Sequence, residues 1–130
     1  MKRYPYNGTQ AQPYTTLFGL FDRNAGFGNR GAWALPPRWL ARRDSLNLAT
    51  PLNAASTNDI IGGNSGSPVI SREGEIVGLI FDGNVEGLPA RFLFTEARGR
   101  SVFVDSRAIV EVLRRVYDAG PLAEELANNH

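Results

Sequence analysis

Short runs of apolar and β-branched residues, separated by turn-forming residues, fill most of this chain. The pattern is typical of β-structure, because strands are short and need Gly, Asn, Asp or Pro between them. We expect strands over 14–21, 46–49 and 101–104. Residues 22–31 then form a loop, and Thr50-Pro51 marks a strand edge or a bend.

Two further runs predict a β-hairpin in the second half of the chain. Its strands cover 67–71 and 75–81, and the turn between them is Arg72-Glu73-Gly74. After Glu75 the second strand is rich in β-branched and other apolar residues, so we expect it to be largely buried. Upstream, a proline pair excludes a long helix, although a short one can begin within 38–43.

Apolar residues spaced three or four positions apart predict one amphipathic helix near the C-terminus. They are Ala108, Ile109, Val112, Leu113 and Val116. Asp105 or Ser106 is suited to cap the start of this helix. Gly120 and Pro121 are expected to end it, and 122–127 adds a short helical tail.

These elements predict a mainly β, barrel-like fold with a C-terminal α-helix. A length of 130 residues suits a single domain. We expect an irregular N-terminal segment over 1–13, a barrel over 14–104, a helix over 105–119 and a tail over 120–130.

Composition narrows the function classes. A net charge of +1 gives no reason to expect nucleic acid or an anionic membrane as a partner. The chain has no cysteine and one histidine, so we expect no disulfide, no metal site and no cofactor, and no phosphate-binding glycine loop is present. No apolar run approaches the about 20 residues of a membrane span, and the first residues do not form a secretory signal.

The motif Gly63-Asn64-Ser65-Gly66-Ser67-Pro68 is the strongest chemical signal in the sequence. Trypsin-like hydrolases present a nucleophilic serine in such a loop, where adjacent backbone N–H groups stabilise the oxyanion. Ser65 is the candidate nucleophile, the amides of Gly63 and Ser65 are the candidate oxyanion hole, and Ser67 is a loop hydroxyl. The same residue types also form ordinary surface turns.

A serine nucleophile needs a general base, and the sequence offers a poor one. Its single histidine, His130, is the last residue. Asp22, Asp44 and Asp59 precede Ser65, but no histidine accompanies them in the order that trypsin-like chains use. We therefore expect half of a catalytic site.

Three stretches resemble one bacterial enzyme family. Residues 57–69, TNDIIGGNSGSPV, look like the nucleophile segment of the dipeptidyl peptidase VII / dipeptidyl aminopeptidase BII family, and 78–84 and 100–107 continue the match. The resemblance implies a serine exopeptidase of the periplasm or cell surface that removes dipeptides from oligopeptides with a free N-terminus. It also implies a chymotrypsin-like double β-barrel, of which this chain is the C-terminal portion, mainly the second barrel.

The resemblance assigns roles to three positions. Ser65 matches the nucleophile, Asp82 the aspartate that binds the substrate's α-ammonium, and Gly83 the position that shapes the P1 pocket. Arginine at that last position accompanies acidic P1 residues in the family, and glycine accompanies apolar ones, so apolar P1 residues are expected. Without the resemblance, Asp82-Gly83 reads as a turn. Asn64 departs from the aspartate of the general trypsin pattern, so activation through a buried ion pair at this position is not expected.

Three hypotheses remain open at this stage. The chain is a fragment of such a peptidase, inactive alone, whose partners are an oligopeptide and the upstream remainder of the catalytic domain, with a homodimer as an option for the full-length protein. Alternatively, it is a non-catalytic β-domain that binds peptide N-termini. The third hypothesis is a fragment of an unrelated trypsin-like endopeptidase.

Overall fold

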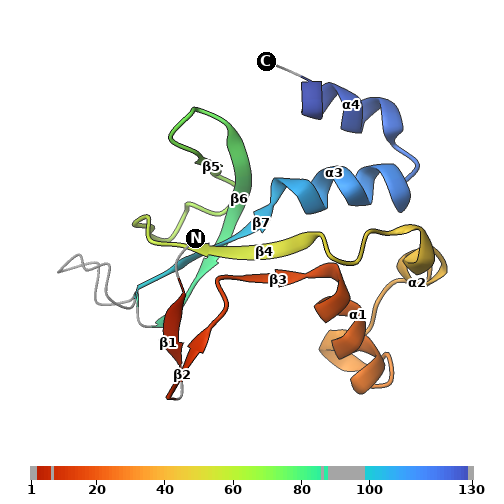
Figure 1. Ribbon diagram of the computed structural model, residues 1–130, viewed down its shortest axis with the longest axis horizontal. Coiled ribbons are helices and arrows are strands. Elements are labelled where there is room, and N and C mark those ends of the chain that lie inside the picture. The colour runs from red at the N-terminus through yellow and green to blue at the C-terminus, as the bar shows by residue number, and fades with distance from the viewer. Residues whose placement is uncertain (1–2, 7, 86, 88–98, 129–130) are drawn as a thin grey trace. The chain divides into compact units, whose positions relative to one another are not determined.

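A computed structural model describes residues 3–6, 8–85, 87 and 99–128 of the chain (Figure 1). Its contacts group into two compact units, and each is treated by itself. The sheet unit comprises Met1–Thr15 and Leu52–Ser106, and the helical unit comprises Thr16–Pro51 and Arg107–His130. The single-domain boundaries expected from the sequence stay a prediction.

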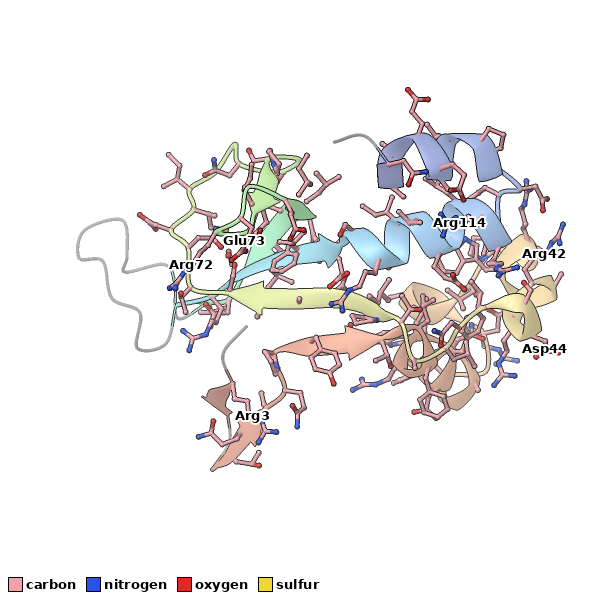
Figure 2. The ribbon with its side chains drawn as sticks, turned by 45° about the horizontal axis from the view of Figure 1, so that its top comes forward. Arg3, Arg42, Asp44, Arg72, Glu73 and Arg114 are labelled. Carbon is pink, nitrogen blue, oxygen red and sulfur yellow. The ribbon has the colours of Figure 1, made fainter. Side chains whose placement is uncertain are left out.

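A five-stranded sheet forms the first unit, with the strand order β3-β4-β7-β6-β5 (Figure 1). The strands are β3 (Tyr14–Thr16), β4 (Pro51–Ser56), β5 (Pro68–Ile70), β6 (Ile76–Gly83) and β7 (Ser101–Asp105). The pairs β4–β7, β6–β7 and β5–β6 are antiparallel. The predicted hairpin is confirmed as β5 and β6, and Arg72 and Glu73 lie in its turn (Figure 2).

The core of the sheet unit lies on one face of the sheet. Ala54, Ile80 and Phe103, from the three central strands, are buried together, and Ile60 and Val69 pack against them. The prediction that the second hairpin strand is largely buried is wrong: Ile76 is 60% and Phe81 45% exposed. Successive side chains of a strand point to opposite faces, so a continuous apolar run does not by itself show that both faces are covered.

The N-terminal segment is more regular than expected. β1 (Tyr4–Tyr6) and β2 (Thr9–Ala11) pair as an antiparallel ribbon, so the prediction of an irregular segment is wrong for these residues. Gly8, between them, has a positive φ of 75°, which glycine adopts without steric cost and which suits a tight turn.

The predicted strand over 14–21 and loop over 22–31 are largely replaced by a helix. β3 ends at Thr16 and α1 (Leu17–Gly26) follows, because the Thr16 hydroxyl caps the helix by accepting the Gly19 amide hydrogen at 3.3 Å. Leu17, Phe21 and Asn24 form its buried face. Their spacing of three to four residues was visible in the sequence, but the β-favouring residues around it concealed the helical period.

The strand predicted over 46–49 is also wrong. Asn47 makes a turn there: its side-chain oxygen accepts the Ala49 amide hydrogen at 3.2 Å, and its carbonyl accepts that of Thr50 at 3.0 Å. The strand at this place, β4, begins only at Pro51, two residues after the predicted strand ends, and proline fits there because the first residue of a strand need not donate to the ladder.

Short helices complete the helical unit. They are η1 (Gly31–Trp33), α2 (Pro37–Ala41), η2 (Arg43–Ser45), α3 (Ser106–Arg115) and α4 (Gly120–Asn128). α2 confirms the short helix expected after the proline pair, and α3 the amphipathic helix. The prediction that Gly120 and Pro121 end this helix is wrong: α3 ends at Arg115, and these two residues begin α4, since proline is tolerated in the first turn of a helix.

Three surface ion pairs link the helices of this unit. Arg38 on α2 and Arg42, which caps the C-terminus of α2, both bind Asp118 Oδ2, at 3.0 and 2.9 Å, just beyond α3. Arg114 on α3 binds Glu124 on α4 at 2.7 Å (Figure 2). Within the described ranges, no helix is both long and apolar enough to cross a membrane.

Candidate active site

A cavity of about 250 Å³ lies in the sheet unit, and three separate segments line it. These segments are 57–65, 80–84 and 99–101, with Gly87 in addition. All four residues singled out in the sequence, Gly63, Ser65, Asp82 and Gly83, belong to this lining. The loop of Ser65 packs beside the end of β6, and this brings Gly63 and Ser65 close to Asp82 and Gly83.

Two consecutive turns shape the loop that carries Ser65. The first closes where the Asn64 amide donates to the Ile61 carbonyl at 3.2 Å, and the second where the Ser67 amide donates to the Asn64 carbonyl at 2.9 Å. Gly63 and Gly66, the third residues of these turns, have φ values of 103° and 88°. Such positive φ angles at the third position are those of type II turns and explain the glycines of the motif.

Backbone bonds to β6 hold the same loop in place. The Gly66 amide donates to the Ile80 carbonyl at 2.7 Å, and the Ile80 amide donates to the Ser67 carbonyl at 3.0 Å. Ser67 is half-buried between them, whereas Ser65 is exposed. The strand therefore fixes the base of the loop and leaves position 65 accessible.

The amides next to Ser65 are not used by the fold. In the part of the chain that the structure describes, neither the Gly63 amide nor the Ser65 amide donates a hydrogen bond. Both residues are exposed, so no protein group blocks these two amides. They are available to an oxyanion formed at Ser65.

Asp82 lies near the end of β6, just after an irregularity in the sheet. The register against β7 shifts between Ile80 and Asp82, so Phe81 is an extra residue in the ladder. A bulge of this kind re-aims the side chains that follow it. Asp82 Oδ1 accepts the Gly83 amide hydrogen at 2.8 Å, and within the described residues Oδ2 has no hydrogen bond or ion pair.

Gly83 marks a tight part of the cavity wall. A Cβ atom added there would lie 3.2 Å from Ile60 Cδ1 and 3.4 Å from the Arg100 carbonyl oxygen. Glycine therefore preserves space that any side chain would narrow. Sequence reasoning did not identify Ile60 and Arg100 as wall residues, because only the pairing of β6 with β7 brings 100 next to 83.

A hydroxyl and amide cluster, also missed from the sequence, fixes the loop that leads to the serine motif. Ser101 Oγ donates to Asn58 Oδ1 at 2.8 Å and lies 2.6 Å from Ser56 Oγ, which also contacts Asn58 Oδ1. Ser56 and Ser101 face each other across β4 and β7. Because Ser101 is buried, these polar groups need one another's hydrogen bonds.

A general base is not found in this cavity. The described lining residues include no histidine, and His130 lies outside the described residues. Asp59 lines the cavity, whereas Asp22 and Asp44 belong to the helical unit. Among the residues that the structure describes, no three His, Cys, Asp or Glu side chains gather in a way that could hold a metal ion.

Comparison with known proteins places the chain among peptidases. Residues 1–128 match the family described as Peptidase S46. An Asp/Glu-specific dipeptidyl-peptidase of Shewanella putrefaciens is 34% identical over an alignment that covers 91% of this chain and 18% of the relative. Dipeptidyl-peptidase 7 of Phocaeicola vulgatus is 32% identical and covers 94% of this chain and 18% of the relative.

Solved structures agree with this assignment. A crystal structure of Porphyromonas endodontalis DPP11 superposes with a TM-score of 0.84 at 26% identity, covering 97% of this chain and 19% of that one. The same protein in complex with the dipeptide Arg-Glu gives a TM-score of 0.80. The predicted fold class is confirmed: an antiparallel sheet with C-terminal helices that forms part of a chymotrypsin-like double barrel. The chain spans about a fifth of the length of these relatives.

Proposed function

Because this chain belongs to the Peptidase S46 family, we propose that it is the nucleophile-bearing part of a serine dipeptidyl aminopeptidase. The observation that supports this most directly is the joint lining of one cavity by Gly63, Ser65, Asp82 and Gly83. Apart from a general base, removal of an N-terminal dipeptide requires a nucleophile, amide donors for the oxyanion, a carboxylate for the ammonium and room for the P1 side chain.

The proposed reaction begins with the substrate's α-ammonium at Asp82. Two residues span at most about 7 Å, so an ammonium bound close to Ser65 places the second peptide bond at the nucleophile. Ser65 Oγ attacks the carbonyl carbon of that bond, and the amides of Gly63 and Ser65 bind the oxyanion. The Ser65 proton passes to a base and then to the leaving amine, and water hydrolyses the acyl-enzyme.

That base must come from outside the cavity described above. We propose that a histidine and an aspartate of an upstream part of the catalytic domain supply it, and that this chain alone does not hydrolyse peptides. The proposed location is the periplasm or cell surface, and a homodimer of the full-length protein belongs to the same hypothesis.

We also propose that the P1 pocket takes apolar residues. Relatives named Asp/Glu-specific and relatives named dipeptidyl-peptidase 7 match this chain about equally, at 34% and 32% identity, so overall similarity does not decide the preference. Gly83 supports an apolar preference, because it brings neither charge nor bulk to the wall near Ile60.

A binding experiment on the 130-residue chain tests the proposal without requiring a base. Isothermal titration with a dipeptide that has a free N-terminus should show binding, and N-acetylation of the dipeptide or Asp82→Asn should abolish it. Asn53→Ala, on β4 and outside the cavity lining, is the matched control. Equal affinity for the free and acetylated dipeptides would contradict the ammonium site.

A dipeptide boronic acid tests the nucleophile. Its boron accepts Ser65 Oγ as a fourth ligand and the proton goes to solvent, giving a tetrahedral adduct that ¹¹B NMR detects. Ser65→Ala should abolish the adduct and leave binding of the free dipeptide unchanged. An adduct that persists in this variant would exclude Ser65 as the nucleophile.

The second candidate function is a binding module without chemistry. The absence of a histidine from the described cavity lining favours it. It predicts dipeptide binding that depends on Asp82 but no boronate adduct, so the two titrations separate the hypotheses.

A further inference from the structure

We propose that Asn64 is a positioning residue whose side chain holds the Gly62–Gly63 peptide so that the Gly63 amide stays available to the oxyanion. The inference rests on the proposed function and adds to it the reason why this amide is free. Asn64 itself does not touch the reacting atoms in this mechanism; it acts through the backbone of the turn before Ser65.

Asn64 closes the first turn twice. Its backbone amide donates to the Ile61 carbonyl at 3.2 Å, and its side-chain Oδ1 accepts the Ile61 amide hydrogen at 2.8 Å. Residues 61 and 64 therefore form a reciprocal pair around Gly62 and Gly63. The side chain lies in the cavity wall, and its bond to the Ile61 amide is exposed to solvent.

The turn type determines the orientation of the peptide between residues 62 and 63. Type I and type II turns share their end-to-end hydrogen bond and differ by a rotation of the central peptide of about 180°. Gly63 has a φ of 103°, which is the type II arrangement. Rotation to type I would reverse the Gly63 N–H and remove it from the oxyanion site.

The two glycines cannot hold this arrangement themselves. Glycine has no side chain and samples positive and negative φ about equally, so the Gly62–Gly63 peptide rotates easily in the absence of an external constraint. A Cβ added at either glycine would meet nothing within 4 Å, so packing does not restrict them. The second bond of Asn64 to Ile61 ties the ends of the turn in addition to its backbone bond, and in this proposal the added tie limits rotation of the central peptide.

Only the acceptor oxygen of the Asn64 side chain takes part in the bond to the Ile61 amide, so two variants form a matched pair. Asn64→Asp keeps an acceptor at the same position, whereas Asn64→Ala removes it. In the 130-residue chain, Asn64→Ala should accelerate hydrogen exchange of the Ile61 amide and weaken the dipeptide boronate adduct by about tenfold, the effect of one lost hydrogen bond. Asn64→Asp should retain protection of that amide and most of the adduct affinity.

Comparing the affinities of Asn64→Ala for two ligands distinguishes a positioning role of Asn64 from a role in overall stability. The free dipeptide binds through Asp82 and needs no oxyanion hole, so Asn64→Ala should leave its dissociation constant unchanged. The inference would be overturned if Asn64→Ala weakened the binding of the free dipeptide and of the boronate equally. It would also be overturned if Asn64→Asp weakened the boronate adduct as much as Asn64→Ala does. If Asn64→Ala does not fold, Asn64→Asp is tested alone: loss of its boronate adduct while the Ile61 amide stays protected would overturn the inference.

Failure of the inference and failure of the proposed function give different results. No boronate adduct with the unsubstituted chain overturns the nucleophile assignment, and the inference with it. An adduct that depends on Ser65 but is unaffected by Asn64→Ala overturns the role of Asn64 alone.

Discussion

Single glycines set the dimensions of this site at the scale of one residue. Gly63 and Gly66 allow two tight turns around Ser65, and Gly83 keeps the cavity wall open beside Ile60. The sequence indicated the first two, because turn glycines in a serine motif have a known geometric purpose. The neighbours of Gly83 could not be predicted, since they belong to other strands.

Gly83→Ala should narrow the P1 pocket selectively. Its backbone does not have a positive φ, so alanine is not strained, but the new methyl group would press on Ile60 at 3.2 Å. We expect the dissociation constant of a dipeptide ending in Phe to rise about tenfold, and that of one ending in Ala to change little, because small losses of pocket space are worth about 1–3 kcal/mol. Isothermal titration of both dipeptides measures this. Equal weakening would show that Gly83 does not face the P1 side chain.

At the scale of elements, the close approach of β6 and β7 depends on a further glycine. A Cβ at Gly78 would collide with the ring of Phe103 and with the Val104 carbonyl oxygen. The neighbouring side chain is a core residue and the other atom is backbone, so neither moves away cheaply. From the sequence alone, Gly78 was recognised only as one residue of an apolar strand.

Gly78→Ala should therefore destabilise the protein by about 3 kcal/mol or more, beyond the usual cost of an added methylene in a packed core. Urea unfolding followed by tryptophan fluorescence measures the change. Gly26→Ala is the matched control: it ends α1, a Cβ there meets nothing within 4 Å, and helix propensity predicts a neutral or slightly stabilising effect. A similar small effect of both substitutions would contradict the packing of β6 on β7.

Some helices and strands could be predicted from the sequence, and others could not. The β5–β6 hairpin and α3 were predicted, because a turn glycine and a helical stripe are local signals. α1 was mistaken for a strand because its cap, Thr16, lies in a β-favouring run. The turn at Asn47 was missed for a similar reason, since its hydrogen bonds are made by an asparagine inside an otherwise apolar run.

At the scale of the whole molecule, the proposed function gives the cavity only the nucleophile side of a catalytic site. A serine without a general base is a weak nucleophile at neutral pH. We expect the purified 130-residue chain to leave a chromogenic dipeptidyl substrate intact while it still forms the boronate adduct. The measurement is release of the chromophore over hours at high protein concentration. Turnover that disappears in Ser65→Ala would show that the chain provides its own base.

The sequence by itself determined the serine loop, the hairpin beside it, the amphipathic helix and the family resemblance, because each is written in residues that are near one another along the chain. The tertiary structure alone decided that 57–65, 80–84 and 99–101 share one cavity, that Phe81 is an extra residue in the ladder, and that Ile60 faces Gly83. These features depend on strand order and register, and hydrogen bonds between distant segments fix both.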